Sequence, residues 1–167
     1  SGFSHYIRTD VAPIYLFSDL ETRLPAWFRK NFLKDNIIHI RTSFLPAGIG
    51  LNEDNAKSYP LTISSPERAI LECLYLTPSK LDMMEVFQIM SGLVNLRPSV
   101  VQKLLEECSS VKVKRLFLYM SNKANHQWIR FLDLSSVDLG KGDRSIVSNG
   151  VYDSRFHITL PKDIAQL

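Results

Sequence analysis

The chain has 167 residues, enough for about one domain, and its 45% hydrophobic and 22% charged residues argue against disorder. No apolar run approaches the ~18 residues that span a bilayer and no signal peptide opens the chain, so we expect a cytoplasmic location and no membrane partner. The net charge of +3 is mild, but residues 97–167 hold 11 Lys and Arg against 7 Asp and Glu, which indicates a patch able to attract phosphate or an acidic partner.

The first 64 residues predict three strands, one helix and one exposed loop. In chain order these are a strand over 12–18, a helix over 24–32 with Pro25 in its first turn, a strand over 36–44, a Gly- and Asn-rich loop over 45–58 and a strand over 59–64.

The stretch "SSPERAILECLYL" (64–76) carries the clearest helix start. Ser65 and Pro66 begin the helix, and Glu67 lies in its first turn, where an acid favours the helix dipole. Arg68 lies in the same turn, where a cation is unfavourable, so we expect it to have a partner. A structural ion pair with a nearby acid is favoured over a ligand. The buried stripe is expected to contain Ala69, Ile70, Cys73 and Leu74.

Two further helices follow, over 82–93 and 97–108. The next stretch, "SSVKVKRLFLYMSNKANHQWIRF" (109–131), holds five basic residues and no acid. At helical spacing Val113, Leu116, Phe117 and Met120 point inward, whereas Lys112, Arg115, Tyr119 and Lys123 share another face. Ser121-Asn122 are expected to interrupt the helix. The candidate phosphate-binding residues are Lys112, Lys114, Arg115, Lys123 and Arg130, and the alternative is a solvated helix face.

The C-terminal segment returns to strands. A short helix over 126–132 is expected to be held by Trp128, Asn149-Gly150 predicts a β-hairpin, and 156–161 predicts a strand stopped by Pro161. The fold class is therefore α+β, in a single domain with short strands near both ends and a central run of helices.

The sequence carries no motif for catalysis, metal or cofactor binding. "AGIGLNE" lacks the glycine spacing of a nucleotide-binding loop, the four histidines are scattered, and no Asp or Glu is followed two residues later by Lys as in many metal-dependent nucleases. We therefore expect no catalytic residues, metal or cofactor. Two alternatives stay open: a nuclease-like or other phosphate-handling enzyme, which a deep cleft lined by several carboxylates would favour, and a plain dimerisation or protein-interaction domain.

Four blocks in order resemble the AbiEi family, the antitoxins and autoregulators of bacterial type IV toxin–antitoxin systems. They are "APIYLFSDLETRLPAWFRK", "SSPERAILECLYL", "SVKVKRLFLYMSNKANHQWIRFLDLSSVDLGKGDR" and "FHITLPKDI", within a similarity from about Val11 to Ile164.

The resemblance implies that residues 1–167 form the C-terminal antitoxin domain of a longer protein, which would begin with a winged-helix DNA-binding domain. The start at Ser1-Gly2 without an initiator Met fits this expectation. The full protein would bind operator DNA, mainly through that first domain, repress its own operon, and counteract an AbiEii-like nucleotidyltransferase toxin without a stable complex. A homo-oligomer is compatible with the sequence, and the family offers no catalytic residues to carry over.

Overall fold

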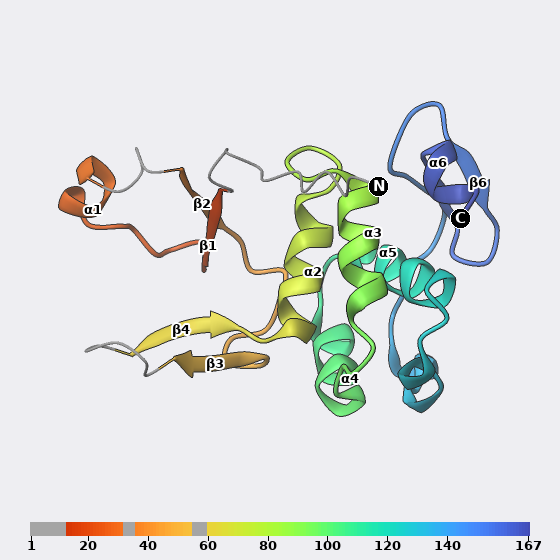
Figure 1. Ribbon diagram of the computed structural model, residues 1–167, viewed down its shortest axis with the longest axis horizontal. Coiled ribbons are helices and arrows are strands. Elements are labelled where there is room, and N and C mark those ends of the chain that lie inside the picture. The colour runs from red at the N-terminus through yellow and green to blue at the C-terminus, as the bar shows by residue number, and fades with distance from the viewer. Residues whose placement is uncertain (1–12, 32–35, 55–59) are drawn as a thin grey trace, which may run out of the picture. The chain divides into compact units, whose positions relative to one another are not determined.

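The fold is that of a computed structural model, which describes residues 13–31, 36–54 and 60–167 (Figure 1). In chain order its elements are β1 (Ile14–Ser18), α1 (Ala26–Asn31), β2 (Ile37–Arg41), β3 (Leu51–Asp54), β4 (Leu61–Ser64), α2 (Pro66–Leu76), α3 (Met83–Gly92), α4 (Pro98–Glu107), α5 (Val111–Lys123), the 3₁₀ helices η1 (Gln127–Phe131) and η2 (Leu134–Ser136), β5 (Arg144–Ser145), β6 (Val151–Asp153), β7 (Ile158–Leu160) and α6 (Lys162–Ala165). The predicted α+β class, with strands near both ends and helices between them, is confirmed.

The chain divides into two compact units, Ser1–Ser43 and Phe44–Leu167. In the first unit β1 and β2 pair in parallel, with Ile14 opposite Ile37 and Ser18 opposite Arg41, and α1 lies in the connection between them. None of the described residues of this unit is buried. Parallel strands are normally covered on both faces. In this unit the described residues cover β1 and β2 only in part.

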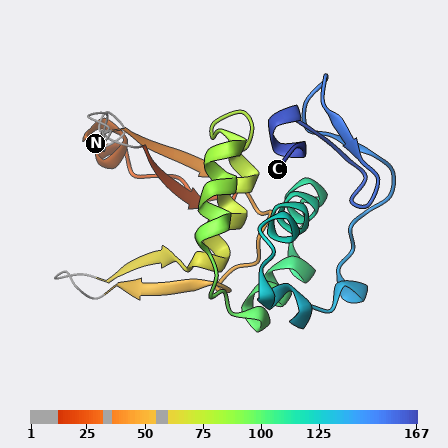
Figure 2. The same cartoon turned by 45° about the vertical axis from the view of Figure 1, so that its right-hand side comes forward.

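The core of the second unit forms around α2 and α5. The two helices pack against each other, and α2 also contacts α3 and α4; Figures 1 and 2 show α2 and α3 side by side. The predicted inward face of α5 is confirmed, because Val113, Leu116, Phe117 and Met120 are all fully buried. In α2, Ile70 and Leu74 are buried as expected, whereas Ala69 and Cys73 are only half-buried and Leu71 lies in the core instead.

The expected interruption of α5 at Ser121-Asn122 is wrong. The helix continues to Lys123 and satisfies both polar side chains within it: Ser121 Oγ donates to the Phe117 carbonyl at 2.6 Å and Asn122 Nδ2 to the Leu118 carbonyl at 2.7 Å. The predicted helix over 126–132 is the 3₁₀ helix η1. As expected, Trp128 holds it: the ring is buried and its Nε1 donates to the Leu93 carbonyl at 2.9 Å.

The loop predicted over 45–58 contains a strand. Residues Leu51–Asp54 form β3, which pairs antiparallel with β4 and places Asn52 opposite Ile63. The polar sequence of β3 has little β propensity of its own, so its strand conformation depends on the hydrogen-bonding partner that β4 supplies. Residues 55–58 of the predicted loop lie outside the described part of the chain.

The hairpin predicted at Asn149-Gly150 is wrong. The C-terminal sheet has the order β5-β7-β6, so the strands on either side of Asn149-Gly150 are not neighbours. The hairpin lies instead between β6 and β7. Its turn is made by Asp153, whose Oδ1 accepts from the Phe156 backbone N–H at 2.9 Å, and by His157, whose φ of 53° is left-handed.

Candidate functional site

The predicted basic face of α5 is divided between buried and exposed cations. Lys112 is half-buried, and its Nζ donates to the carbonyls of Tyr75 at 2.8 Å and Thr77 at 2.7 Å. These carbonyls lie at the C-terminal end of α2, where a cation is favourable to the helix dipole. Burial lowers the pKa of the Lys112 ammonium. Lys112 therefore joins α5 to the end of α2.

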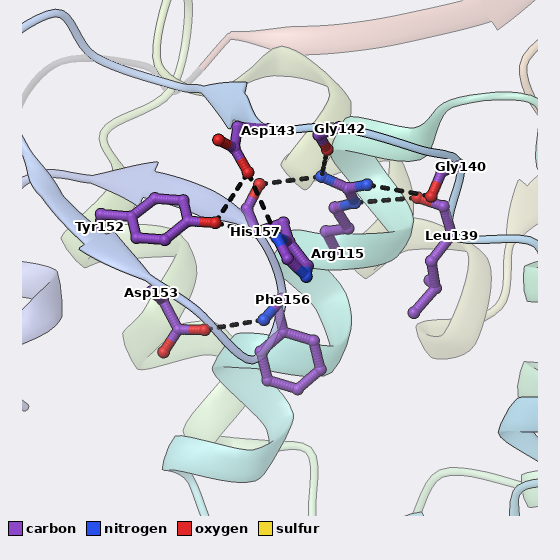
Figure 3. A network of polar contacts seen from close by, with 9 residues as sticks. All are labelled: Arg115, Leu139, Gly140, Gly142, Asp143, Tyr152, Asp153, Phe156 and His157. Atoms are coloured by element: carbon purple, nitrogen blue, oxygen red, sulfur yellow. Dashed lines mark hydrogen bonds and ion pairs between the residues drawn. The ribbon is translucent and has the colours of Figure 1, made fainter.

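Arg115 is only 2% exposed, and its guanidinium is surrounded by main-chain carbonyls (Figure 3). Nε donates to Leu139 O at 2.9 Å, and Nη2 donates to Gly140 O at 3.2 Å. Nη1 donates to both Gly142 O at 2.7 Å and His157 O at 2.8 Å. Arg115 thus holds the loop after η2 and the turn before β7 against the central helix.

The expectation that Lys114 and Arg115 present charge to solvent is wrong. Lys114 is 4% exposed, and the guanidinium of Arg115 is already occupied by four carbonyls. Tyr119, predicted on the same face, is also buried. Helical spacing placed Arg115 and Tyr119 on the same face as Lys112, but the C-terminal segment folds over this part of α5 and covers these two residues. Lys114 points away from that face, and it is buried as well.

Lys123 and Arg130 are the candidates that remain exposed. Lys123 Nζ lies 3.4 Å from the Ala165 carbonyl and 5.8 Å from the centre of the Tyr119 ring. Arg130 lies over Phe131 and borders a shallow depression of about 250 Å³. That depression is lined by Asn122, Asn125, His126, Gln127, Ile129 and Arg130. A contact of Lys123 or Arg130 with DNA phosphates stays a prediction.

The Ser-Pro-Glu-Arg segment makes structural contacts at the start of α2. Ser65 occupies the N-cap position, but its Oγ donates to Glu67 Oε2 at 2.6 Å instead of capping a backbone N–H. The buried Glu67 carboxylate also accepts from Arg97, from the backbone N–H at 3.0 Å and from Nε and Nη2 at 2.9 Å each. The hydrogen bond from the Arg97 side chain outweighs burial and lowers the pKa of Glu67 to about 2. Arg97 lies 30 residues after Glu67, directly before Pro98. Nothing in its local sequence indicated that it would bind Glu67.

Arg68 has the structural ion pair that the sequence favoured. Its Nε lies 2.8 Å from Glu72 Oε1, and Nη1 donates to the carbonyls of Pro46 at 2.8 Å and Ile49 at 2.9 Å. The ion pair is one helical turn apart in α2, and the carbonyls belong to the loop before β3. The cation in the first turn is therefore compensated by two separate sets of acceptors.

An exposed polar cluster lies beside the Arg115 contacts (Figure 3). Tyr152 Oη donates to Asp143 Oδ1 at 2.7 Å and lies 2.9 Å from His157 Nδ1, which is 3.2 Å from Asp143 Oδ1. The Asp143 hydrogen bond raises the pKa of Tyr152, and the same bond lowers the pKa of Asp143. The cluster therefore joins Asp143, which directly precedes β5, to Tyr152 and His157 of the β6–β7 hairpin.

Neither of two depressions on the described surface has a described carboxylate in its lining, whereas the enzyme alternative would be favoured by several. A depression in the first unit is lined by three arginines and a histidine, and the one beside Arg130 is lined by amides and basic side chains. Across residues 13–31, 36–54 and 60–167, no three His, Cys, Asp or Glu side chains gather as metal ligands would. Among the same residues, no helix combines the length and apolar character needed to cross a bilayer.

A family match covers almost the whole chain. The sequence profile of the family described as "Transcriptional regulator, AbiEi antitoxin, Type IV TA system" matches residues 12–161. The chain belongs to this AbiEi family. The AbiEi profile covers residues in both units, including the Ser65–Arg68 segment and all of α5. No curated protein and no solved structure shows significant similarity to the chain.

Proposed function

We propose that this chain is the antitoxin domain of a type IV toxin–antitoxin system in the bacterial cytoplasm. It would counteract a nucleotidyltransferase toxin without a stable complex, and it would assist operator binding by a winged-helix domain that precedes it in the full-length protein. The observation that carries the proposal is the AbiEi family match over residues 12–161. We propose no catalytic role and no bound metal or cofactor.

The contribution to operator binding would come from Lys123 and Arg130. Both side chains are exposed, one at the end of α5 and the other in η1, so both can approach a phosphate without unfolding the core. Phosphate contacts add affinity and fix the register on a duplex, but they do not select a sequence. Sequence selection would be the task of the winged-helix domain.

Antitoxicity is tested by producing this chain together with its cognate toxin. We expect it to restore growth and yet fail to repress a reporter transcribed from its own promoter, because sequence readout needs a recognition element in the major groove. Circular dichroism of the purified chain provides the control for folding. A folded chain that leaves the toxin lethal, or one that binds its operator tightly and selectively, would contradict the proposal.

The assisting role is tested in the full-length protein with Lys123→Glu and Arg130→Glu combined. If each residue contacts one phosphate, operator affinity falls, and the slope of log affinity against log salt becomes shallower by roughly two units. The matched control is Lys103→Glu with Arg144→Glu, which makes the same charge change at other exposed positions. If the two double variants have the same operator affinity and the same salt slope, Lys123 and Arg130 do not contact phosphates and are only solvated surface.

One observation favours the alternative of a protein-interaction domain. Leu61 and Ile63 lie two residues apart in β4, so they share a face of the β3–β4 hairpin, and they are 37% and 47% exposed. An isolated two-stranded hairpin gains stability when such a face is covered. Sedimentation of the wild-type chain and of Ile63→Ser across a concentration series would detect association through this face.

A further inference from the structure

The first unit contains a depression of about 420 Å³ whose described lining is strongly basic. Its lining residues are Thr22, Arg23, Leu24, Arg29, His39 and Arg41. All of them belong to the segment from the end of β1 to the end of β2, so the depression lies within one compact unit. Neither the sequence motifs nor the proposed antitoxin function uses any of these residues.

The parallel β1–β2 pair brings the basic residues together. His39 and Arg41 lie two residues apart in β2, so their side chains project from the same face of the strand pair. The connection from β1 adds Arg23, and α1 adds Arg29. Two short contacts order this arrangement: Ser18 Oγ lies 2.8 Å from His39 Nε2, and Asp19 Oδ1 accepts from the Thr22 N–H at 2.7 Å.

The positive charge of the depression is not neutralised within the described chain. No ion pair or side-chain hydrogen bond of Arg23, Arg29 or Arg41 is found among the described residues, and no carboxylate belongs to the described lining. The nearby Asp19 carboxylate accepts from Thr22 Oγ1 at 2.6 Å, and among the described residues it forms no ion pair with any of the three arginines. Three guanidiniums around one hollow repel one another unless an anion lies between them.

We propose that this depression binds the phosphate groups of a small phosphorylated ligand of the nucleotide class. A guanidinium donates two parallel hydrogen bonds to phosphate, which suits Arg for this task better than Lys. The volume falls in the range of small-molecule sites, roughly 300–1,000 Å³. Leu24 offers an apolar contact, and the His39 ring, which contacts Ser18 through Nε2, offers Nδ1 for a hydrogen bond beside the arginines. The inference stands independently of the antitoxin proposal.

The test is calorimetric titration of the purified chain with adenosine, AMP and ADP at about 150 mM salt, where exposed charges more than about 8 Å apart are screened. We expect affinity to rise from adenosine to AMP to ADP. Arg23→Ala, Arg29→Ala and Arg41→Ala should each weaken ADP binding about tenfold or more, since each removes a charge-assisted contact. The matched control is Lys30→Ala, the exposed neighbour of Arg29 in α1 that does not line the depression, and it should change affinity less than about threefold.

Arg→Lys variants at the same three positions keep the charge and lose the planar fork, so they carry the test if an alanine variant fails to fold. They should weaken ADP binding less than alanine does, but measurably. Oligonucleotides with a 5′-phosphate and with a 5′-hydroxyl distinguish a free nucleotide from a strand end. The proposal is overturned if ADP does not bind, if adenosine binds as tightly, if Lys30→Ala weakens binding as much as Arg29→Ala, or if only oligonucleotides bind, with or without the 5′-phosphate.

Discussion

Arg115 shows how a cation on a polar helical stripe becomes part of a core. Its position in α5 resembles that of Lys112, yet its side chain ends among carbonyls from residues 24 to 42 positions further along the chain. Four of the five guanidinium N–H groups donate to these carbonyls. The carbonyls of Leu139, Gly140 and Gly142 belong to a loop, where the guanidinium supplies hydrogen bonds of the kind that a strand partner would give. The His157 carbonyl also accepts from the Arg144 backbone N–H at 2.9 Å.

Replacing Arg115 should therefore affect stability and not only surface charge. Arg115→Ala removes a buried donor from the carbonyls of Leu139, Gly140 and Gly142, whereas the His157 carbonyl keeps the Arg144 N–H, so we expect the free energy of unfolding to fall by roughly 3 kcal/mol. Arg115→Lys should recover a part of this loss, because an ammonium has three donors but not the planar geometry. Urea unfolding measures both, with the exposed Arg144→Ala as control, expected within about 0.5 kcal/mol of wild type. A wild-type unfolding midpoint for Arg115→Ala would contradict the described role.

Glu67 predicts a pH dependence of stability. Its pKa is about 2 in the folded chain against an ordinary value of 4.5, so the carboxylate contributes stability above about pH 4.5 that is lost as the pH falls towards 2. With Arg97 partly exposed, we place this contribution at about 2–3 kcal/mol. Glu67→Gln should be less stable than wild type by this amount at pH 7, and the difference should vanish near pH 2.

Urea unfolding of the two proteins at pH 7, 4 and 2.5 checks the expectation. Glu107→Gln, an exposed change in α4, is the control for the loss of one negative charge and should shift stability by less than about 0.5 kcal/mol. A difference between Glu67→Gln and wild type that stays constant from pH 7 to 2.5 would show that the Arg97 contact contributes nothing through its charge.

The C-terminal strands are arranged by backbone contact and not by turn propensity. β7 lies in the middle of its sheet, parallel to β5 and antiparallel to β6, and the connection through Asn149-Gly150 runs between the two outer strands. Gly150 has no left-handed φ, so it is not used as a turn residue. A Cβ at this position would overlap sterically with the Leu160 carbonyl oxygen. The glycine is needed because β7 passes so closely.

Gly150→Ala should accordingly destabilise the sheet. The neighbouring atom belongs to a backbone carbonyl that cannot move without breaking strand pairing, so we expect a cost of about 1–3 kcal/mol. Gly92→Ala is the matched control: it lies in α3 with no atom near the new Cβ, and should be neutral or stabilise by up to about 1 kcal/mol. Thermal unfolding followed by circular dichroism compares the two. Equal midpoints would mean that β7 is free to move away.

On the scale of the whole molecule, the two units differ in how they are stabilised. The second unit buries entire faces of α2 and α5, whereas no described residue of the first unit is buried, and Ile14 and Trp27 are about 60% exposed. Burial of apolar surface is the dominant favourable contribution to folding. The resistance of the chain to unfolding should therefore reside mainly in residues 44–167.

Native-state hydrogen exchange tests this difference. Backbone amides of β1 and β2 should exchange through small local openings, whereas those of α2 and α5 should exchange only with global unfolding. A chain consisting of residues 44–167 should keep a cooperative unfolding transition and protection in the same two helices. Protection of β1 and β2 equal to that of α5 would instead mean that the first unit is covered and unfolds together with the second.

Local features of the sequence were sufficient to predict the helices of the second unit, the buried face of α5 and the family. The 3.6-residue spacing of apolar side chains placed α2 to α5 and the buried face of α5, and Ser65-Pro66 placed the start of α2, because these features depend on neighbours within one or two turns. The order of four sequence blocks indicated the AbiEi family, which the profile over residues 12–161 confirms.

Tertiary structure alone decided which charges are buried, which strands pair and where basic residues gather. The side chains of Arg115 and Lys112 are long enough to reach backbone carbonyls of distant segments, so helical spacing alone does not determine whether they are exposed to solvent. Strand order depends on competition between partners, which overrode the Asn149-Gly150 signal. Arg23, Arg29 and Arg41 are separated by up to 18 positions and carry no common motif; only the parallel pairing of β1 with β2 brings them around one depression. The physical reason is the same in each case, since helix periodicity and capping act over a few residues whereas desolvation, strand pairing and charge clustering depend on contacts between residues far apart in the chain.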